Sequence, residues 1–424
     1  MEREKIKELY AWKDRAGRKP LIVRGARQVG KTWLIKEFAK KAFRKSAYVN
    51  FENDEYLSHI FEGDIDIKRI LSALSLRTGV DIDKDTLLIF DEIQAAKRGV
   101  TALKYFCEDA REYPVIAAGS LLGISMYRGD SFPVGKVEFM DLYPMNFREF
   151  LLADGHKKWV DVIEQRQWDL LQAIKDKLID ELRNYYFVGG MPEVVSAFIE
   201  RRDYKEVRRL QDDILSTYSN DFSKHAPNEE VPRIRMVWQS VPGQLAKENR
   251  KFVYGMVKTG SRAKDFEVAI EWLKDAGLIY KINRCKLAQL PLNAYEDFNA
   301  FKIYLLDVGL LCAMNKVSPE TLLTGNAFFE QFKGALTELY VLEQMIGHKD
   351  EIFYWSADNS KGEIDFLVQD KGIITPIEVK AEENLRSKSL RAFIERNPKL
   401  HGIRYSMSDY RDQGWMENIP LYAI

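Results

Sequence analysis

One motif near the amino terminus constrains the fold more than any other feature of this chain. It reads GxxxxGKT over Gly25–Thr32, and it lies between an apolar run, Leu21–Arg24, and a helical pattern, Thr32–Phe43. Glycines allow a loop to turn its backbone N–H groups toward phosphate oxygens, and the amino terminus of a helix adds a favourable dipole. Strand, loop and helix in this order predict a phosphate-binding loop.

The motif also predicts the ligands of this loop, ATP and Mg²⁺. The Lys31 ammonium would reach the β- and γ-phosphates, and the Thr32 hydroxyl would ligate Mg²⁺. The residues expected to contact the nucleotide are Gly25, Ala26, Arg27, Gln28, Val29, Gly30, Lys31, Thr32 and Trp33.

Two acids follow the apolar run Thr86–Phe90, as expected at the carboxyl end of a buried strand. Asp91 would hold the magnesium shell, and Glu92 would orient and polarise the attacking water as a general base. Ser120 ends the next apolar run, Val115–Ala118 with Gly119, where a polar side chain can sense the γ-phosphate. A plain helix cap is the alternative interpretation of Ser120.

The first 140 or so residues alternate short β-rich runs with helical patterns, which predicts a parallel sheet covered on both faces. The expected strands are Leu21–Arg24, Ser46–Phe51, Leu87–Phe90 and Val115–Ala118, and the expected helices are Thr32–Phe43 and Leu103–Arg111. From about residue 145 the pattern becomes mostly helical, with amphipathic stretches such as Trp168–Tyr185.

Composition excludes several classes of protein. Lys and Arg number 64, as do Asp and Glu, so the chain is not a polycation of the histone type, although local basic patches remain available. Hydrophobic residues make up 46%, which excludes bulk disorder. Only three cysteines occur, in no metal-ligand spacing, which disfavours a disulfide scaffold or zinc ribbon. A charged start and the lack of any run of about 18 apolar residues predict a cytoplasmic protein with no membrane contact.

A basic stretch over 243–264 precedes a predicted helix, Asp265–Ala276, and a β-like run, Leu278–Asn283. Phe266, Ala269, Ile270 and Leu273 have the helical spacing of one buried face. Helix, turn, helix and strand in this order are typical of a winged helix. The basic stretch before it would bind the phosphates of double-stranded DNA. Alternatively, the winged helix would pack against the rest of the chain, with its lysines in solvent.

Acidic residues gather again near the carboxyl end, in two predicted strands joined at Lys371-Gly372. A two-residue loop places Asp365 opposite Glu378, and period two puts Lys380 on the face of Glu378. Two such carboxylates can ligate a divalent metal, and a lysine can stabilise charge that develops at phosphorus. Thr375, Ile377 and Val379 should face the core. Pro376 lacks an N–H, so one edge of the hairpin should be free or bulged.

Six sequence motifs together resemble a large prokaryotic family of AAA-type (AAA+) P-loop ATPases with a nuclease-like carboxyl-terminal domain. They are GARQVGKT, LLIFDEIQ, AAGS, SFPVGKVEFMDLYPMNFREFL, YYFVGGMPEVV and FKIYLLDVGLL. The resemblance implies ATP binding, a winged-helix segment and a restriction-endonuclease-like terminus. The acids and lysine near the end, with Glu338 in the helical run Ala335–Met345, resemble a PD-(D/E)XK nuclease site. That likeness carries Glu338, Asp365, Glu378 and Lys380 across as candidate catalytic residues, with Asp365 and Glu378 as metal ligands and Glu338 as a further expected ligand.

The expected fold is therefore α/β in four parts. Residues 1–145 should form the P-loop ATPase core, 146–235 a helical extension, 236–315 a winged-helix-like domain, and 320–424 the nuclease-like domain. The favoured function is a Mg²⁺-dependent ATPase that couples nucleotide state to DNA binding or processing. The alternative is a nucleotide-gated switch with negligible turnover, whose terminal domains bind a protein or DNA partner without cleaving it.

AAA+ enzymes usually complete hydrolysis with an arginine from a neighbouring subunit. Arg98, Lys136 and Arg148 are basic candidates for such a role, and each also fits an ordinary surface or ion-paired position. The sequence does not choose among them, so it leaves the oligomeric state open.

Overall fold

A computed structural model describes residues 1–120, 133–247, 250–324, 330–349, 351–357, 362–382 and 387–424. The chain forms two compact units. Residues 2–143 with 275–277 make the N-terminal unit, and residues 1, 144–274 and 278–424 make the C-terminal unit.

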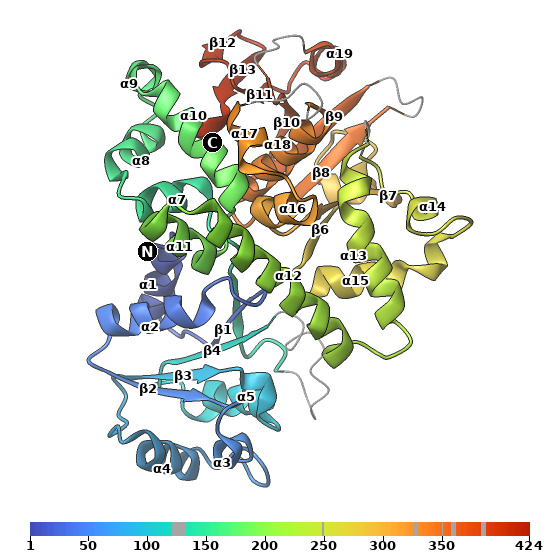
Figure 1. Ribbon diagram of the computed structural model, residues 1–424. Coiled ribbons are helices and arrows are strands. Elements are labelled where there is room, and N and C mark those ends of the chain that lie inside the picture. Colours follow the sequence, from blue (N-terminus) through green and yellow to red (C-terminus); the bar gives the residue numbers. More distant parts are fainter. Residues whose placement is uncertain (121–132, 248–249, 325–329, 350, 358–361, 383–386) are drawn as a thin grey trace. The chain divides into compact units, whose positions relative to one another are not determined.

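The N-terminal unit is a five-stranded parallel sheet with helices on both faces, as predicted (Figure 1). Its strands, in the order β2-β3-β4-β1-β5, are β1 (Leu21–Gly25), β2 (Lys45–Asn50), β3 (Thr86–Asp91), β4 (Val115–Ser120) and β5 (Glu138–Asp141). Its helices are α1 (Ile6–Asp14), α2 (Lys31–Ala42), α3 (Glu55–Ser58), α4 (Ile67–Thr78), the 3₁₀ turn η1 (Ile93–Ala95) and α5 (Gly99–Asp109).

Burial on both faces explains why the strands of this unit are apolar throughout. All six residues of β3 are buried, and residues from α3, α4 and α5 pack in one cluster against β2, β3 and β4. Figure 1 shows α1 and α2 on the other face of the sheet. A strand covered on both sides loses the polar alternation of a half-exposed strand, which is the pattern the sequence shows.

Strand order brings the polar strand ends of this unit to one edge. β4 lies between β1 and β3, and its last residue, Ser120, is paired with Gly25 at the end of β1. Asp91 ends β3 on the other side of β4. The phosphate loop, Ser120 and Asp91 therefore share the carboxyl edge of the sheet, where open α/β sheets bind ligands.

The C-terminal unit begins with a helical region. Its helices are α7 (Phe147–Ala153), α8 (Lys157–Glu164), α9 (Trp168–Ala173), α10 (Lys175–Val188), α11 (Pro192–Arg201), α12 (Tyr204–His225), α13 (Val231–Leu245), α14 (Tyr254–Val257), η2 (Ala263–Asp265) and α15 (Glu267–Asp275). The stretch Trp168–Tyr185, expected as one helical stretch, is two helices, because the backbone at Ile174 leaves helical geometry (φ −117°, ψ 12°).

Three glycines lie where three of the sequence motifs meet, at Met145, at Gly189–Gly190 and at Asp307–Gly309. A Cβ at Gly190 would lie 2.0 Å from the Met145 carbonyl oxygen, and one at Gly309 would lie 2.4 Å from that of Val188. Gly189 has φ +74° and lies against the Asp307 carboxylate, which accepts a hydrogen bond of 2.6 Å from the Gly190 N–H. Glycine is needed here because the backbones approach too closely for a side chain.

An eight-stranded mixed sheet follows, in the order β12-β13-β11-β10-β9-β8-β6-β7. Its strands are β6 (Ile279–Cys285), β7 (Glu296–Leu305), β8 (Glu351–Ser356), β9 (Glu363–Asp370), β10 (Ile373–Val379), β11 (Gly402–Ser406), β12 (Arg411–Asp412) and β13 (Met416–Pro420). The helices among them are η3 (Leu292–Tyr295), α16 (Val308–Met314), α17 (Pro319–Thr324), α18 (Glu330–Met345), α19 (Lys388–Arg396) and η5 (Leu421–Ala423). β8 joins β6 through one residue pair, Arg284 with Tyr354, and β10 joins β11 through three.

The predicted hairpin of β9 and β10 is confirmed. Asp370 pairs with Ile373, and Lys371 and Gly372 both have positive φ, as a two-residue turn between twisted strands requires. The ladder runs on to Phe366 with Ile377, so the next pair in this register is Asp365 with Glu378.

One detail of the hairpin prediction is confirmed and one is wrong. β11 pairs with β10 on the side away from β9, but that ladder begins at Ile377, directly after Pro376, so the edge at the proline is free as predicted. The expected core face is mixed: Ile377 is buried, but Thr375 and Val379 are only half-buried, while Ile374 is buried. Both faces of this sheet are covered, so burial does not alternate.

The segment expected as a winged helix contains the predicted helix and strand, but the strand belongs to the eight-stranded sheet. Phe266, Ala269, Ile270 and Leu273 are all buried, as the spacing predicts. The β6 strand that follows pairs with β7 in a hairpin, and this hairpin continues the sheet of the terminal strands. A separate winged-helix domain and the four-part division of the chain therefore stay predictions.

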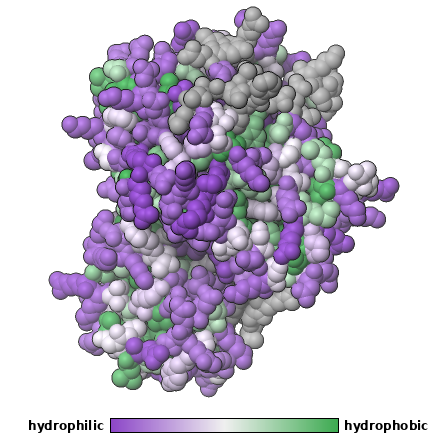
Figure 2. All heavy atoms as spheres, viewed as in Figure 1, coloured by the Kyte–Doolittle hydropathy of each residue, from purple (hydrophilic) through white to green (hydrophobic). Residues whose placement is uncertain are grey.

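None of the helices in the described parts of the chain combines the length and apolar character that crossing a membrane requires. Hydrophilic residues predominate on the face shown in Figure 2, with apolar residues in small groups between them.

Candidate functional site

The loop between β1 and α2 has the backbone geometry that its glycines predict. Gly30 has φ +92° and directly precedes α2, and Gln28 is also left-handed at φ +66°. Gly25 has a different function, because a Cβ there would lie 2.2 Å from the Leu142 carbonyl oxygen. Ala26 and Val29 are buried, so their side chains belong to the core and only their backbone can face a phosphate.

The Lys31 side chain lies within the loop. It is 7% exposed, and its ammonium donates to the carbonyl oxygens of Gly25 and Ala26 at 3.0 and 2.8 Å. Burial lowers the pKa of Lys31 to about 8, against the opposing attraction of Glu92 and Asp91. The lysine is thus a desolvated cation, which strengthens its attraction for an anion.

Thr32 and Asp91 meet at the predicted magnesium position. The Thr32 hydroxyl donates to Asp91 Oδ2 at 2.9 Å, and Asp91 is 3% exposed. A hydroxyl and a carboxylate so close together are hard oxygen donors of the kind that Mg²⁺ prefers. The residues present therefore fit this ion.

Tyr48 is a functional candidate that the sequence reasoning missed. Its hydroxyl donates to the same Asp91 oxygen at 2.8 Å, and burial together with that carboxylate raises the pKa of Tyr48 to about 12. The Lys36 ammonium lies 3.6 Å from the centre of its ring. The sequence signal for this contact was a tyrosine in the strand next to the acidic strand. Asn50 of β2 pairs with Asp91 of β3, which brings Tyr48 close to the Asp91 carboxylate.

Glu92 has an unusual backbone conformation for a residue that is not glycine. Its φ is +49°, and the Gln94 side-chain amide donates to its carboxylate. Left-handed backbone of this kind concentrates at functional sites, because the surroundings must hold it in place. Gln94 therefore joins the site as a residue that positions Glu92.

The remaining predicted nucleotide contacts belong to the phosphate loop, to the start of α2 and to the end of β4. Ser120 and Arg27 are half-buried, and Trp33 is 39% exposed at the start of α2. Arg3 was not predicted: it is buried and donates to the carbonyl oxygens of Val29 and Tyr143 at 2.8 and 2.6 Å. It ties the phosphate loop to the chain after β5.

The three basic candidates for the role of a hydrolysis-completing arginine have different surroundings. Lys136 forms an ion pair of 2.8 Å with Glu108, and the Arg98 guanidinium donates to the Gly63 carbonyl. Arg148 lies in α7, in the C-terminal unit. Ser131 and Phe132, which open the long motif before Lys136, lie outside the described residues.

The terminal acids come together in part. Asp365 accepts a hydrogen bond of 2.8 Å from the Val379 N–H, and the Lys380 ammonium lies 3.1 Å from Glu378, on the face that the sequence predicts. Glu378 is 4% exposed, and its Oε2 has no hydrogen-bond partner among the residues that the structure describes. A buried carboxylate oxygen of this kind is costly unless something binds it.

Glu338, the third expected acid, has other partners. It is fully buried in α18, where Lys302 and the Tyr304 hydroxyl bind Oε1 and Arg250 binds Oε2. Lys302, also fully buried, pairs with Glu363 at 2.5 Å as well. The structure thus places Glu338 in a network of buried ion pairs. The signal for this network was Lys302 and Tyr304 alternating with apolar residues in one strand.

The distances between carboxylates agree with the separation of Glu338 from Asp365 and Glu378. Within the described residues, one group of three side chains could hold a metal ion, because its donor atoms all lie within 4.8 Å of one another. It consists of Asp154, His156 and Glu181. Arg202 pairs with Asp154 and lies 3.9 Å from Glu181, so this group already has a cation. Glu338, Asp365 and Glu378 do not form such a group.

The basic stretch over 243–264 is only partly available to a nucleic acid. Lys247 donates to Gln244 and to the Lys251 carbonyl, and Arg250 is the partner of Glu338. Lys258, Arg262 and Lys264 are exposed.

Comparison with known families divides the chain into three matches. Residues 17–151 match a family described as an AAA domain. Residues 179–321 match DUF8612 and residues 333–424 match DUF4143, each described as a domain of unknown function. No curated protein matches the chain.

Three solved structures are similar to parts of the chain. A Walker-type ATPase of Pyrococcus abyssi has 14% identity and a TM-score of 0.47, over 74% of this chain and 95% of that one. The Aeropyrum pernix ORC1 protein, solved in complex with DNA, has 11% identity and a TM-score of 0.28, over 74% and 90%. The Thermotoga maritima RuvB Holliday junction branch migration motor has 13% identity and a TM-score of 0.31, over 66% and 89%. These scores are low, and the chemistry of the chain rests on its own residues.

The family match and the parallel sheet agree for the N-terminal part of the chain. Both support an AAA-type P-loop ATPase domain over residues 17–151. The winged helix and the nuclease-like identity have no such match.

Proposed function

We propose that the protein is a Mg²⁺-dependent ATPase whose nucleotide site is the loop Gly25–Thr32 with Asp91 and Glu92. The observation that carries this proposal is the hydrogen bond between Thr32 and Asp91, because it joins the phosphate loop to the acidic strand at a pair of magnesium donors. The buried Lys31 supplies the cation for the phosphates.

Each residue has a defined task in this proposal. Backbone N–H groups of the loop and the Lys31 ammonium hold the β- and γ-phosphates, which orients the terminal phosphate for attack. The magnesium ion, when bound, neutralises charge on the phosphate oxygens. Glu92 accepts the proton of the attacking water, and Gln94 keeps its carboxylate in position. Ser120, beside Gly25, reports the presence of the γ-phosphate.

Two substitutions separate binding from turnover. Lys31→Ala should abolish ATP binding and turnover, whereas Glu92→Gln should keep Mg²⁺-ATP binding and lower turnover by about 10²–10⁴-fold. The matched control is Lys41→Ala, since Lys41 is a half-exposed lysine of the same helix, paired with Glu37. Unchanged turnover in Lys31→Ala, with normal unfolding behaviour, would refute the site.

A second candidate function belongs to the C-terminal unit and rests on Glu378. Its buried Oε2 has no hydrogen-bond partner among the described residues, and Asp365 is next in register across the hairpin. We infer that these two carboxylates bind a divalent cation and that Lys380 stabilises charge at phosphorus during DNA cleavage. Glu338 is left out of this set, because Arg250, Lys302 and Tyr304 hold its oxygens.

Cleavage is tested with linear and circular DNA in Mg²⁺ or Mn²⁺, with and without ATP. Loss of cleavage in Asp365→Ala, with cleavage kept in Lys349→Ala, supports a nuclease, and ATP dependence shows coupling of the two sites. Lys349 is a suitable control because its ion pair with Asp370 lies at the far end of the same strand. No cleavage under any condition leaves a terminal domain that binds DNA or a protein without cutting.

The rate of ATP turnover decides between an ATPase coupled to DNA binding or processing and a nucleotide-gated switch. ATP hydrolysis stimulated by double-stranded DNA favours coupling to DNA processing. Very slow hydrolysis that is indifferent to DNA favours a switch whose terminal domains bind a protein or DNA partner. A cytoplasmic location is part of the proposal.

A further inference from the structure

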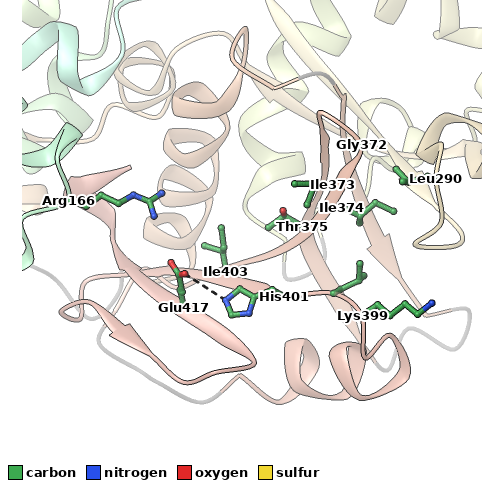
Figure 3. Close-up of a pocket in the computed structure, with 11 residues that line it drawn as sticks. Arg166, Leu290, Gly372, Ile373, Ile374, Thr375, Lys399, His401, Ile403 and Glu417 are labelled. Carbon is green, nitrogen blue, oxygen red and sulfur yellow. Dashed lines mark ion pairs between the residues drawn. The ribbon is translucent and has the colours of Figure 1, made fainter.

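A pocket of about 520 Å³ lies in the C-terminal unit, and none of the predicted site residues lines it (Figure 3). Its walls come from the loop between α8 and α9, the loop before η3, the first half of β10, the chain before β11, and β13. The volume falls in the range of small-molecule sites, roughly 300–1,000 Å³.

The pocket exists because β10 and the chain before β11 diverge. The parallel ladder joins Ile377 to Ile403 and stops there, so the residues before each do not pair with one another. Ile373–Thr375 form one wall of the gap and Lys399–His401 form the other. Pro376 stands where the ladder ends and has no N–H with which to extend it. The gap between β10 and the chain before β11 therefore follows from the position of Pro376 in the sequence.

One side of the pocket is lined by aliphatic side chains. These side chains are more exposed to solvent than aliphatic side chains usually are. Ile373 is 67% exposed and Leu290 is 50% exposed, and both line the pocket with Ile374 and Ile403. Large aliphatic side chains left this open at a concave site mark a surface that binds an apolar group.

The other feature of the pocket is positive charge that no acid in the described ranges neutralises by an ion pair. Arg166 and Lys399 line the pocket from opposite sides (Figure 3), and the groups that interact electrostatically with Arg166 are the neutral side chains of Tyr405 and Tyr410. Arg166 sits at φ +51° in the loop between α8 and α9. His401 faces Glu417 at 3.9 Å, and this pair supplies the only acid among the lining residues.

We propose that this pocket binds a small carboxylate with an aliphatic chain. The planar guanidinium of Arg166 matches a carboxylate with two parallel hydrogen bonds, and the aliphatic wall takes the chain. Glu417 favours a monoanion, because a dianion such as phosphate would meet its negative charge more strongly. This binding function is independent of the ATPase site.

The probe is octanoate, titrated into the full-length protein and followed by calorimetry and by ligand-observed NMR. We expect saturable binding with one site, at least tenfold tighter than that of octan-1-ol, which has the same chain without the charge. Arg166→Gln should weaken octanoate binding about tenfold, the effect of losing one charge-assisted hydrogen bond, and leave octan-1-ol binding unchanged. Ile373→Ser should weaken both.

Arg44→Gln is the matched control, because Arg44 is an exposed arginine between α2 and β2 in the other unit, with no described ion pair. Each variant is first checked by its thermal unfolding transition. Equal affinity for octanoate and octan-1-ol would reduce the site to an apolar patch. Inorganic phosphate binding as tightly as octanoate would mean an adventitious anion site only. Unchanged octanoate affinity in Arg166→Gln would place the binding elsewhere, and each of these results overturns the proposal.

Discussion

Replacement of Lys302 by methionine tests whether Glu338 is held in a structural ion-pair network. Lys302 is fully buried and pairs with two carboxylates, Glu338 at 3.1 Å and Glu363 at 2.5 Å. Burial raises the pKa of Glu363, and Lys302 opposes that rise. Methionine keeps the volume and removes the charge, so the substitution isolates the electrostatic contribution.

The expected loss of stability follows from leaving buried charge without its partner. Removal of one member of a buried ion pair destabilises by about 3–5 kcal/mol. Arg250 and Tyr304 still bind Glu338, so the lower end of that range applies, about 3 kcal/mol. The double variant Lys302→Met with Glu338→Gln should recover part of the loss, because it removes one of the charges left unpaired. Lys349→Met, which breaks a surface pair of 2.9 Å with Asp370, should lose about 0–1 kcal/mol.

Urea unfolding followed by tryptophan fluorescence measures this difference. Six of the eight tryptophans lie in the C-terminal unit, so its transition dominates the signal: Trp159, Trp168, Trp238, Trp272, Trp355 and Trp415. The midpoint should fall with no change in slope. A loss below about 1 kcal/mol in Lys302→Met, equal to that of Lys349→Met, would refute the network and return Glu338 to the metal-ligand hypothesis.

Three further predictions concern both units. ATP affinity should fall as pH rises above about 8, because free Lys31 loses its proton there while bound phosphate holds it; Lys31→Arg should remove this slope in equilibrium binding between pH 7 and 9.5 or so. Tyr48→Phe should weaken Mg²⁺-dependent ATP binding about 2–10-fold, as a magnesium titration would show; no change would mean that its bond to Asp91 is not part of the site. Gly190→Ala should destabilise by about 1–3 kcal/mol in urea, since its Cβ would lie 2.0 Å from a carbonyl oxygen, whereas Gly255→Ala, with open space around it, should not.

Local signals predicted the N-terminal unit well. The spacing of GxxxxGKT and the acids after β3 are short-range patterns, and parallel pairing brings their ends together. Tyr48 and Arg3 were missed because their contacts with Asp91 and Val29 depend on strand order and on the path of the chain before β1, which no local pattern encodes.

In the C-terminal unit, contacts between residues far apart in the sequence limited what could be predicted about the site. The turn at Lys371-Gly372 sets the register of the hairpin, so the positions of Asp365 and Glu378 followed from the sequence. The partners of Glu338 come from β7 and from the basic stretch before α14, far away in the chain. The pairing of β11 with β10 was missed for the same reason, because β11 lies beyond α19 in sequence.

The narrow connections within the eight-stranded sheet have a consequence for its cooperativity. One residue pair joins β6 to β8, and three join β10 to β11, whereas five pairs join β9 to β10 and seven join β6 to β7. Few hydrogen bonds hold the three blocks β6-β7, β8-β9-β10 and β11-β13-β12 to one another. Amide hydrogens within each block should therefore exchange with solvent together, and each block should open at its own free energy, below that of global unfolding. Such a sheet can lose the order of one block while its neighbours stay folded.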